Sequence, residues 1–583
     1  MRRNRTSTRA HVSAAAAFVS LAALTVSTGA AHGASGSAPP GLAGLATPRG
    51  LGASALILGV GSSGEGQLAG PATGPVDPAH ATPAAARAAA LAAHEHDHMS
   101  SMTSSLPRAR AGAVSAAALN PAVYGRWTTL SYKLPLRTIH ATLLRTGKFL
   151  LIAGSGNIAN DQTIRNFKAY LWDPRTNGLT SVPVPYDAFC SGHLVDANGD
   201  VIVFGGTVGY LYRDGAWTGS NKAYKFNVST STWTALPSMK QARWYPTSVQ
   251  DAKNRFLNYS GFDAKGAVPQ TGEMYDPATR KWTPLASRPL PLYASLQLLK
   301  DGRLAYTGAY FGHDYRTVKP SVFNPLGTGR VEIRDPHSLL DPTHRNAAMS
   351  ALVGSADKQL VWVAGGGFPA LRSTYFIDFN AHAPTVVAGP RLGTAKGFVS
   401  ISHLPDMTAF ETGGGTSTST PVYEASILNP STRRLTAMAP PRLGRTYHSS
   451  AVTMPDGRVV TFGGDPPGDK NFELRIEIFS PPYLFKGARP KLTAAPTQIR
   501  YGGTYKVRAK GSGRLSAVLM RPGSATHSLD ANQRVLALAT KAVKGGVRVT
   551  LPRNRNLAPP GWYLLFVNDG AHRPSVGRWV HLS

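Results

Sequence analysis

The feature that most constrains the fold is a phrase that recurs along the middle of the chain. An apolar stretch runs into one or more glycines, and a variable loop follows. An aromatic stretch, a turn rich in Asp, Pro, Asn, Ser or Thr, and a short final stretch complete the phrase. The glycine-ended stretches lie at residues 150–154, 201–206, 256–261, 304–308, 360–367, 408–414 and 459–464, so the phrase recurs about every 50 residues.

A period of this length with four short strands predicts the blades of a kelch-type β-propeller. The glycines let strands crowd near the central axis, and the aromatic side chains pack between blades. Trp127-Thr-Thr-Leu precedes the first glycine stretch and resembles the outer strand of a blade. We expect it to complete the last blade and close the ring, which removes exposed sheet edges. The fold class is therefore all-β, with a seven-bladed propeller over residues 119–486; six and eight blades are the alternative counts.

The phrase stops after Pro481-Pro-Tyr483, and a different pattern occupies the C-terminal part. Short alternating apolar stretches lie at residues 504–508, 517–520, 546–550 and 562–567. Strands of this length, joined by turns, predict an antiparallel sandwich of immunoglobulin-like class over residues 487–583.

The N-terminal part divides into two segments. Residues 1–34 begin with several arginines and continue with an apolar run over residues 12–26 and then small residues. This pattern predicts a secretory signal peptide, with an uncleaved signal anchor as the alternative. Residues 35–118 are rich in Ala, Gly, Pro and Ser and contain almost no aromatic residues, which predicts a disordered linker. We therefore expect a secreted or cell-envelope-associated protein.

A histidine-rich patch lies within this linker. It contains His94, His98 and Met99, with further histidine and acidic residues between them. Such a set suits a copper- or zinc-scavenging site, and a solvated polar tract is the simpler interpretation.

The chain is strongly basic, with 62 Lys and Arg against 31 Asp and Glu, which gives a formal net charge of +31. Nucleic-acid binding is one interpretation of such a charge. The basic residues of the predicted propeller are scattered and form no packed run, so we expect no nucleic-acid partner. An exported protein that tolerates or uses an anionic cell envelope is the interpretation we prefer.

Four candidate site residues lie at equivalent places in the repeat. Cys190 comes just before the second glycine stretch, Tyr245 just before the third, and the adjacent Tyr447 and His448 just before the seventh. Equivalent positions of propeller blades lie near one end of the central axis, so we expect these side chains to cluster. A fifth candidate, His527, lies in a polar turn of the C-terminal part and could enter the propeller mouth.

Two histidines and two tyrosines form an unusual set of ligands. The set lacks the thiolates of a structural zinc site and the carboxylates of a calcium site. Imidazole and phenolate together suit Cu(II) or Fe(III). Cys190 is the only cysteine, so it forms no intramolecular disulfide, and beside a phenol it permits a thioether crosslink. The simpler interpretation of each residue alone is packing.

Several short phrases carry a resemblance to a known family. They are Phe189-Cys-Ser-Gly192, Ala242-Arg-Trp-Tyr-Pro246, Arg445-Thr-Tyr-His-Ser449, Glu477-Ile-Phe-Ser-Pro-Pro-Tyr-Leu484 and Ala525-Thr-His-Ser528. With these phrases, residues 120–583 resemble the galactose oxidase / glyoxal oxidase family of secreted copper-radical oxidases. The Arg-Trp-Tyr-Pro phrase is closer to the glyoxal oxidases. The resemblance implies that the C-terminal sandwich is of the early-set kind.

The resemblance also implies a role for each candidate residue. One copper ion would be held by Tyr245, Tyr447, His448 and His527. Tyr245 would be the radical site, crosslinked to Cys190, and Tyr447 would be the axial ligand and general base. A ring stacks over the crosslinked tyrosine in galactose oxidase; here Phe262 or a residue from elsewhere would fill that place.

The implied reaction is oxidation of a primary alcohol or an aldehyde by O2, which gives H2O2. A small alcohol, a small aldehyde and a glycan all remain open as substrates, and we expect a monomer. The alternative is a non-catalytic kelch propeller that binds cell-envelope glycans.

Overall fold

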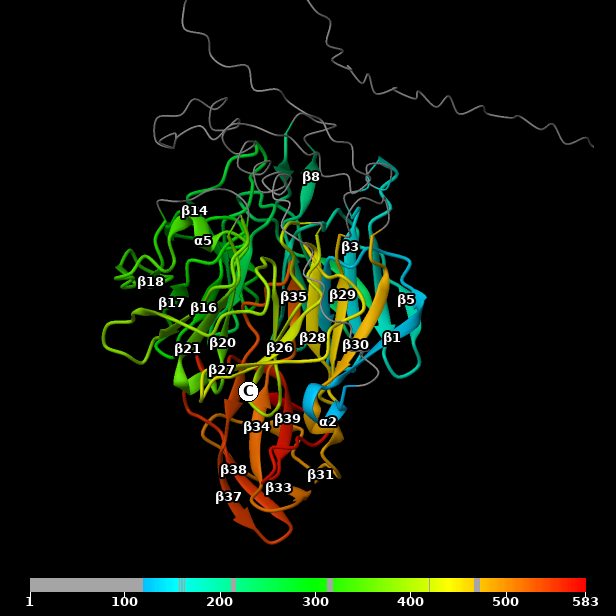
Figure 1. Ribbon diagram of the computed structural model, residues 1–583. Coiled ribbons are helices and arrows are strands. Elements are labelled where there is room, and N and C mark those ends of the chain that lie inside the picture. Colours follow the sequence, from blue (N-terminus) through cyan, green and yellow to red (C-terminus); the bar gives the residue numbers. More distant parts are fainter. Residues whose placement is uncertain are drawn as a thin grey trace, which may run out of the picture. The chain divides into compact units, whose positions relative to one another are not determined.

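The computed structural model describes residues 119–583, apart from residues 157, 159, 160, 162, 211–215, 312–317, 368, 419 and 466–471. The predicted signal segment, the predicted linker and the histidine-rich patch lie outside the described residues. The described part is built almost entirely of strands (Figure 1). Its helical turns are α2 (Pro121–Tyr124), α5 (Pro342–Arg345), η1 (Ala356–Lys358) and η2 (Pro482–Phe485). None of the described helices has the length and apolar character needed to cross a membrane.

Each repeated phrase forms one antiparallel sheet, and seven such sheets occur between residues 126 and 480 of the described part. The first three contain β2 (His140–Leu143), β3 (Phe149–Gly154), β4 (Lys168–Asp173) and β5 (Gly178–Ser181); β6 (Gly192–Val195), β7 (Val201–Phe204), β10 (Ala223–Asn227) and β11 (Thr232–Ala235); and β12 (Thr247–Gln250), β13 (Phe256–Tyr259), β14 (Thr271–Asp276) and β15 (Lys281–Ser287). A small ribbon of β8 (Thr207–Gly209) and β9 (Thr218–Gly219) extends the second phrase.

The other four sheets repeat the same order. They contain β16 (Leu296–Leu298), β17 (Leu304–Tyr306), β18 (Ser321–Phe323) and β19 (Arg330–Glu332); β20 (Met349–Val353), β21 (Leu360–Ala364), β22 (Thr374–Asp378) and β23 (Val386–Ala388); β24 (Ser400–His403), β25 (Ala409–Thr412), β26 (Ala425–Asn429) and β27 (Arg434–Ala437); and β28 (Ser449–Thr453), β29 (Val459–Gly463), β30 (Arg475–Ser480) and β1 (Arg126–Lys133). The number of blades in the ring stays a prediction.

Burial falls from the first strand of each sheet to the last. The first strands β2, β6, β12, β16, β20, β24 and β28 are buried along their whole length, whereas β5, β11, β19 and β27 are mostly exposed. This gradient places the first strands at the centre. β1 pairs with β30, with Trp127 opposite Phe479, so the start of the described chain completes the last sheet, as predicted from Trp127-Thr-Thr-Leu.

The C-terminal part forms two stacked sheets. One contains β31 (Lys491–Ala494), β33 (Thr504–Lys510), β38 (Gly546–Thr550) and β37 (Ala539–Val543), and the other contains β32 (Gln498–Ile499), β40 (Arg578–Leu582), β39 (Gly561–Asn568), β34 (Ser516–Met520) and β36 (Val535–Ala537). Alternate residues of both sheets, such as Val507, Val549, Leu519 and Leu565, share one buried cluster. The predicted sandwich is therefore present.

One C-terminal strand leaves the sandwich and joins the propeller. β35 (Ser524–Thr526) pairs with β2, with Thr526 opposite His140, so it becomes the innermost strand of that sheet. Figure 1 shows β35 among the propeller strands, and it also contacts β28 and β6. Because β28 and β6 are first strands of their sheets, β35 delivers the residues that follow it to the centre of the propeller.

Candidate metal centre

The structure brings all five candidate residues to one place. Cys190 and Tyr245 each lie two residues before an innermost strand, Tyr447 and His448 directly precede β28, and His527 directly follows β35. All five are essentially buried, with exposed fractions of 0% or 1%.

Two groups of polar atoms meet there. The hydroxyl oxygens of Tyr245 and Tyr447 lie 2.7 Å apart and share a hydrogen bond. The Nε2 atoms of His527 and His448 lie 3.3 Å and 3.7 Å from Cys190 Sγ. The two imidazole ring centres are 4.6 Å apart, and the His527 ring lies 5.2 Å from the Tyr447 ring and 5.4 Å from the Tyr245 ring. The rings of all four potential copper ligands therefore lie close together, and both imidazoles contact the thiol.

The backbone at the site is locally strained. Cys190, Tyr245, His448 and His527 have φ of 52°, 66°, 60° and 49°, in the left-handed region that costs a non-glycine residue about 1–2 kcal/mol. This bend sets neighbouring side chains such as Tyr447 and His448 toward one site, which a regular strand cannot do. The Tyr245 amide donates to the Cys190 carbonyl at 3.0 Å, which fastens the two segments together.

The second ring nitrogen of each histidine is occupied by a protein partner. His448 Nδ1 lies 3.0 Å from Asp465 Oδ2, and Arg137 contacts both His448 Nδ1 and the Asp465 carboxylate. His527 Nδ1 lies 2.6 Å from Thr526 Oγ1. Metal-binding histidines generally engage their other nitrogen in this way, which fixes the ring orientation. Both Nε2 atoms face the Cys190 thiol.

Burial favours the neutral, metal-binding form of His527. Removal of the ring from water, together with the neighbouring His448, Arg137 and His193, holds the pKa of His527 well below its usual range. A neutral imidazole offers the lone pair that a metal requires.

Comparison with known proteins identifies the relatives of this chain. Residues 489–582 match the galactose oxidase-like early set domain, and residues 197–240 match the kelch motif. The galactose oxidase of Gibberella zeae is 28% identical over 457 residues, which cover 71% of this chain and 64% of that protein. The chain is similar in sequence to galactose oxidase. The resemblance and the all-β fold class predicted from the sequence are confirmed.

Other relatives of this chain are aldehyde oxidases. One from Arabidopsis thaliana is 37% identical over 174 residues, which cover 26% of this chain and 28% of that protein. Among solved structures, a fungal alcohol oxidase of the AA5 family in complex with copper has a TM-score of 0.68 and 22% identity; the match covers 79% of this chain and all of the other. The match thus spans less than two thirds of the galactose oxidase, 64% of its length, and the whole of the solved alcohol oxidase chain.

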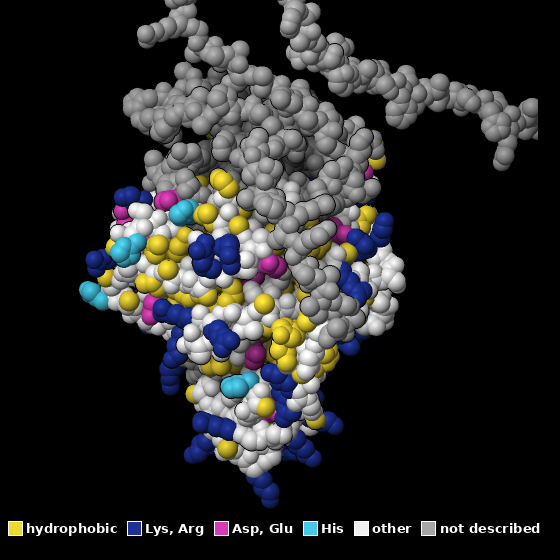
Figure 2. All heavy atoms as spheres, in the orientation of Figure 1, with side chains coloured by type: hydrophobic (Ala, Val, Ile, Leu, Met, Phe, Trp, Pro, Cys, Tyr) yellow, Lys and Arg dark blue, Asp and Glu magenta, His cyan; other side chains and the backbone are white. Residues whose placement is uncertain are grey.

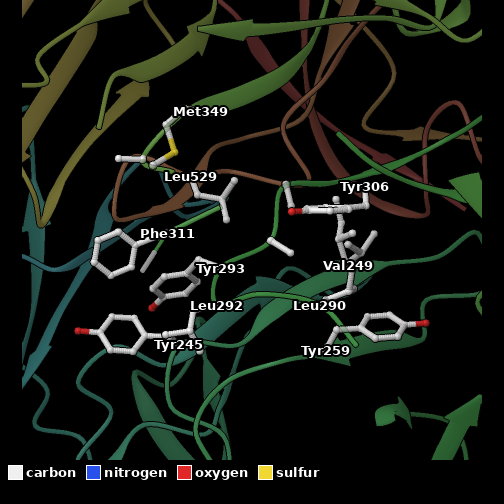
Figure 3. Close-up of a cluster of buried hydrophobic side chains, with 14 of the residues drawn as sticks. Tyr245, Val249, Tyr259, Leu290, Leu292, Tyr293, Tyr306, Phe311, Met349 and Leu529 are labelled. Carbon is white, nitrogen blue, oxygen red and sulfur yellow. The ribbon is translucent and has the colours of Figure 1, made fainter. Parts of the chain in front are cut away.

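Aromatic rings that the sequence did not single out surround Tyr245. The rings of Trp244, Tyr293 and Phe311 lie 4.8, 5.1 and 5.6 Å from that of Tyr245, and Phe311 stacks on Tyr447 at 4.7 Å. Figure 3 shows Tyr245, Tyr293 and Phe311 side by side in one buried cluster. Trp244 directly precedes Tyr245 in the Arg-Trp-Tyr-Pro phrase, and this was the only feature of the sequence that pointed to one of these three rings.

The predicted stacking residue, Phe262, packs beside Trp244. Its ring lies 6.1 Å from the Trp244 ring, and the two residues exchange backbone hydrogen bonds of 2.7 and 2.9 Å. The ring centre of Trp244 lies 4.8 Å from that of Tyr245 and 4.9 Å from that of Trp217. Trp244 thus connects the tyrosine to a group of aromatic residues to which Phe262 contributes.

The donor set at this site fits a copper ion. Two imidazoles whose Nε2 atoms lie near one thiol, together with two hydrogen-bonded phenols, are the ligand types that Cu(II) accepts. Cys190, His448 and His527 also present ligand atoms within 4.8 Å of one another. A buried thiol in this position would be a further soft ligand, or the partner of a tyrosine crosslink.

Proposed function

We propose that the chain is a copper-dependent oxidase that converts a primary alcohol or an aldehyde with O2 and releases H2O2. The observation that carries the proposal is the convergence of His448, His527, Tyr245 and Tyr447 beside the only cysteine of the chain, in a fully buried place. Galactose oxidase and aldehyde oxidases among the relatives support both substrate classes.

The residues divide the reaction between them. Copper held by Tyr245, Tyr447, His448 and His527 would supply one-electron redox chemistry. Tyr447, as tyrosinate, accepts the hydroxyl proton of the substrate. Tyr245, as a phenoxyl radical, takes the hydrogen atom from the substrate carbon. For an alcohol, two electrons and two protons leave the substrate, and O2 receives both to form H2O2.

A thioether between Cys190 Sγ and a ring carbon of Tyr245 would make this radical accessible. Its formation removes the thiol hydrogen and one ring hydrogen with two electrons, and O2 accepts them as H2O2. The sulfur adds electron density to the ring, which makes the radical easier to form and to hold. The backbone hydrogen bond between the two residues and their shared buried cluster support the crosslink.

The surrounding rings protect such a radical. Trp244, Tyr293 and Phe311 pack around Tyr245 and exclude water from it. Tyr293 is also fixed in place, because its hydroxyl donates to the Ser191 carbonyl at 3.2 Å and its amide donates to the Tyr245 carbonyl at 3.1 Å. A non-catalytic glycan-binding propeller has no need of this arrangement, so that alternative is not favoured.

We further propose that the enzyme acts as a secreted or cell-envelope-associated monomer. The arginine-rich start and the apolar run over residues 12–26 support export. The net charge of +31 supports association with an anionic envelope.

The test is peroxide release by the copper-loaded protein, screened over primary alcohols of sugars, simple primary alcohols and small aldehydes such as glyoxal. Tyr245→Phe is expected to abolish turnover with every substrate. Tyr259→Phe is the matched control, because Tyr259 is equally buried and lies in β13 of the same sheet. Peroxide release that survives Tyr245→Phe would overturn the radical assignment.

A further inference from the structure

The C-terminal sandwich carries a far denser positive charge than the rest of the chain. Residues 487–583 contain 16 Lys and Arg but only two acidic residues, Asp530 and Asp569. Asp569 is buried and paired with Arg573, and Asp530 accepts the amides of Ser524, Asn532 and Gln533. Neither carboxylate therefore neutralises the sandwich surface, and Figure 2 shows dark blue side chains around this end of the molecule.

Part of this charge forms an ordered array on one sheet. In β33, Lys506, Arg508 and Lys510 are exposed, while Val507 and Ala509 between them are buried. The alternation places all three cations on the outer face of the sheet. Arg548 of β38, Lys541 of β37 and Lys491 of β31 are exposed in register with them.

The pairing of the strands lines these cations up in rows. Lys506 lies opposite Arg548, and Arg548 lies opposite Lys541, so three positive residues stand side by side across three strands. Lys510 lies opposite Lys491 in a second row. Neighbouring strands are about 4.8 Å apart, and like charges placed directly opposite are destabilising. Among the described residues, no acidic side chain forms an ion pair with any of these six cations.

The outer face offers charge and little else. Its remaining outward positions include Thr504, Thr550 and Ala539. Tyr505 of β33 points the other way and packs against the sandwich core. Val576 is the one large apolar residue that is well exposed among residues 487–583, and it lies outside this sheet. The face thus lacks the aromatic platform that binds single-stranded nucleic acid and the apolar side chains that insert into a membrane.

We propose that this face, formed by Lys491, Lys506, Arg508, Lys510, Lys541 and Arg548, is a docking surface for an acidic polysaccharide. Cations in rows across a sheet suit a linear polymer that carries a carboxylate on successive sugar units. Binding is electrostatic, so it releases counterions and weakens with salt. The surface holds the enzyme on an anionic matrix and makes no contact with the candidate metal centre; the proposal does not depend on catalysis.

The experiment measures binding of the full chain to polygalacturonate, with a neutral glucan, duplex DNA and phosphatidylglycerol vesicles as comparison ligands. The test variant combines Lys506→Gln, Lys541→Gln and Arg548→Gln. The control combines Lys253→Gln, Lys265→Gln and Arg434→Gln, which removes the same charge from exposed propeller positions.

The proposal predicts binding to polygalacturonate but not to the neutral glucan. The test variant should bind at least tenfold more weakly, with a slope of log affinity against log salt that is shallower by about two, while the control stays within twofold. Equal losses in the two variants would show that net charge alone is responsible and would overturn the proposal. Tighter binding to DNA or to vesicles than to polygalacturonate, lost in the test variant, would overturn the assigned class of partner.

Discussion

The hydroxyl groups of Tyr245 and Tyr447 share a hydrogen bond of 2.7 Å, although the residues are 202 positions apart in the chain. They precede the innermost strands of two different sheets, and neither has more than 1% of its surface exposed. Two phenols held this close in a buried site can exchange a proton directly, without a bridging water molecule. The proposed division of labour, with one phenol as base and the other as radical, rests on this contact.

The proton-accepting role of Tyr447 predicts the behaviour of Tyr447→Phe. The variant should lose about 10²–10⁴-fold in kcat, the usual contribution of a general base. Its thioether should still form, because Cys190 and Tyr245 are unchanged. Steady-state peroxide release and intact mass measure the two effects. A kcat within tenfold of the wild type in a crosslinked variant would exclude Tyr447 as the base.

The Asp465 carboxylate orients His448, so its removal should weaken copper binding. In Asp465→Asn the charge that holds both His448 Nδ1 and Arg137 is lost. We expect the copper affinity to fall about 10–100-fold, as measured by competition with a chelator. Asp456→Asn is the control, because Asp456 pairs with Arg458 in a turn at the surface. An unchanged copper affinity in Asp465→Asn would show that this carboxylate does not support copper binding.

A buried histidine outside the proposed ligand set should make the fold sensitive to acid. His193 in β6 lines a small cavity with Ser524, Thr526 and Asn532, and neither of its ring nitrogens has a hydrogen-bond partner among the described residues. Burial lowers the pKa of His193 to about 3. In the unfolded chain the ring accepts a proton below pH 6.5, so the stability that the neutral ring contributes is lost as the pH falls from about 6.5 toward 3.

The variant His193→Gln lacks this titration. Between pH 7.5 and pH 4.5 the wild type should lose about 3 kcal/mol more free energy of unfolding than the variant. Urea unfolding of both proteins at the two pH values provides the comparison, and other titrating groups cancel in the difference. Equal losses in the two proteins would show that His193 is already protonated or solvated in the folded state.

Much of the fold followed from one repeated phrase. Each glycine stretch forms the second strand of its sheet, and Trp127 marks the strand that completes the last sheet. The same repeat placed Cys190, Tyr245, Tyr447 and His448 together, because equivalent positions in successive sheets surround one axis. Fold and ligand cluster were therefore accessible from periodicity and residue type.

The rest of the site depends on contacts that periodicity does not encode. His527 reaches the centre because β35 pairs with β2, and Thr142 and Ser524, which hydrogen bond there, are 382 positions apart. Tyr293 and Phe311 come from loops, where side-chain direction is set by tertiary packing. Asp465 follows a glycine pair, as Thr207 and Thr504 do, so its contact with His448 had no distinct signal.

The central claim is that Cys190 and Tyr245 form one crosslinked radical cofactor beside a copper ion. The most direct test is the intact mass of the protein before and after exposure to copper and O2, with Cys190→Ser as the reference. The account predicts that the wild type becomes lighter by the mass of two hydrogens while Cys190→Ser keeps its mass. A wild-type protein that binds copper in the presence of O2 and keeps its original mass would contradict it.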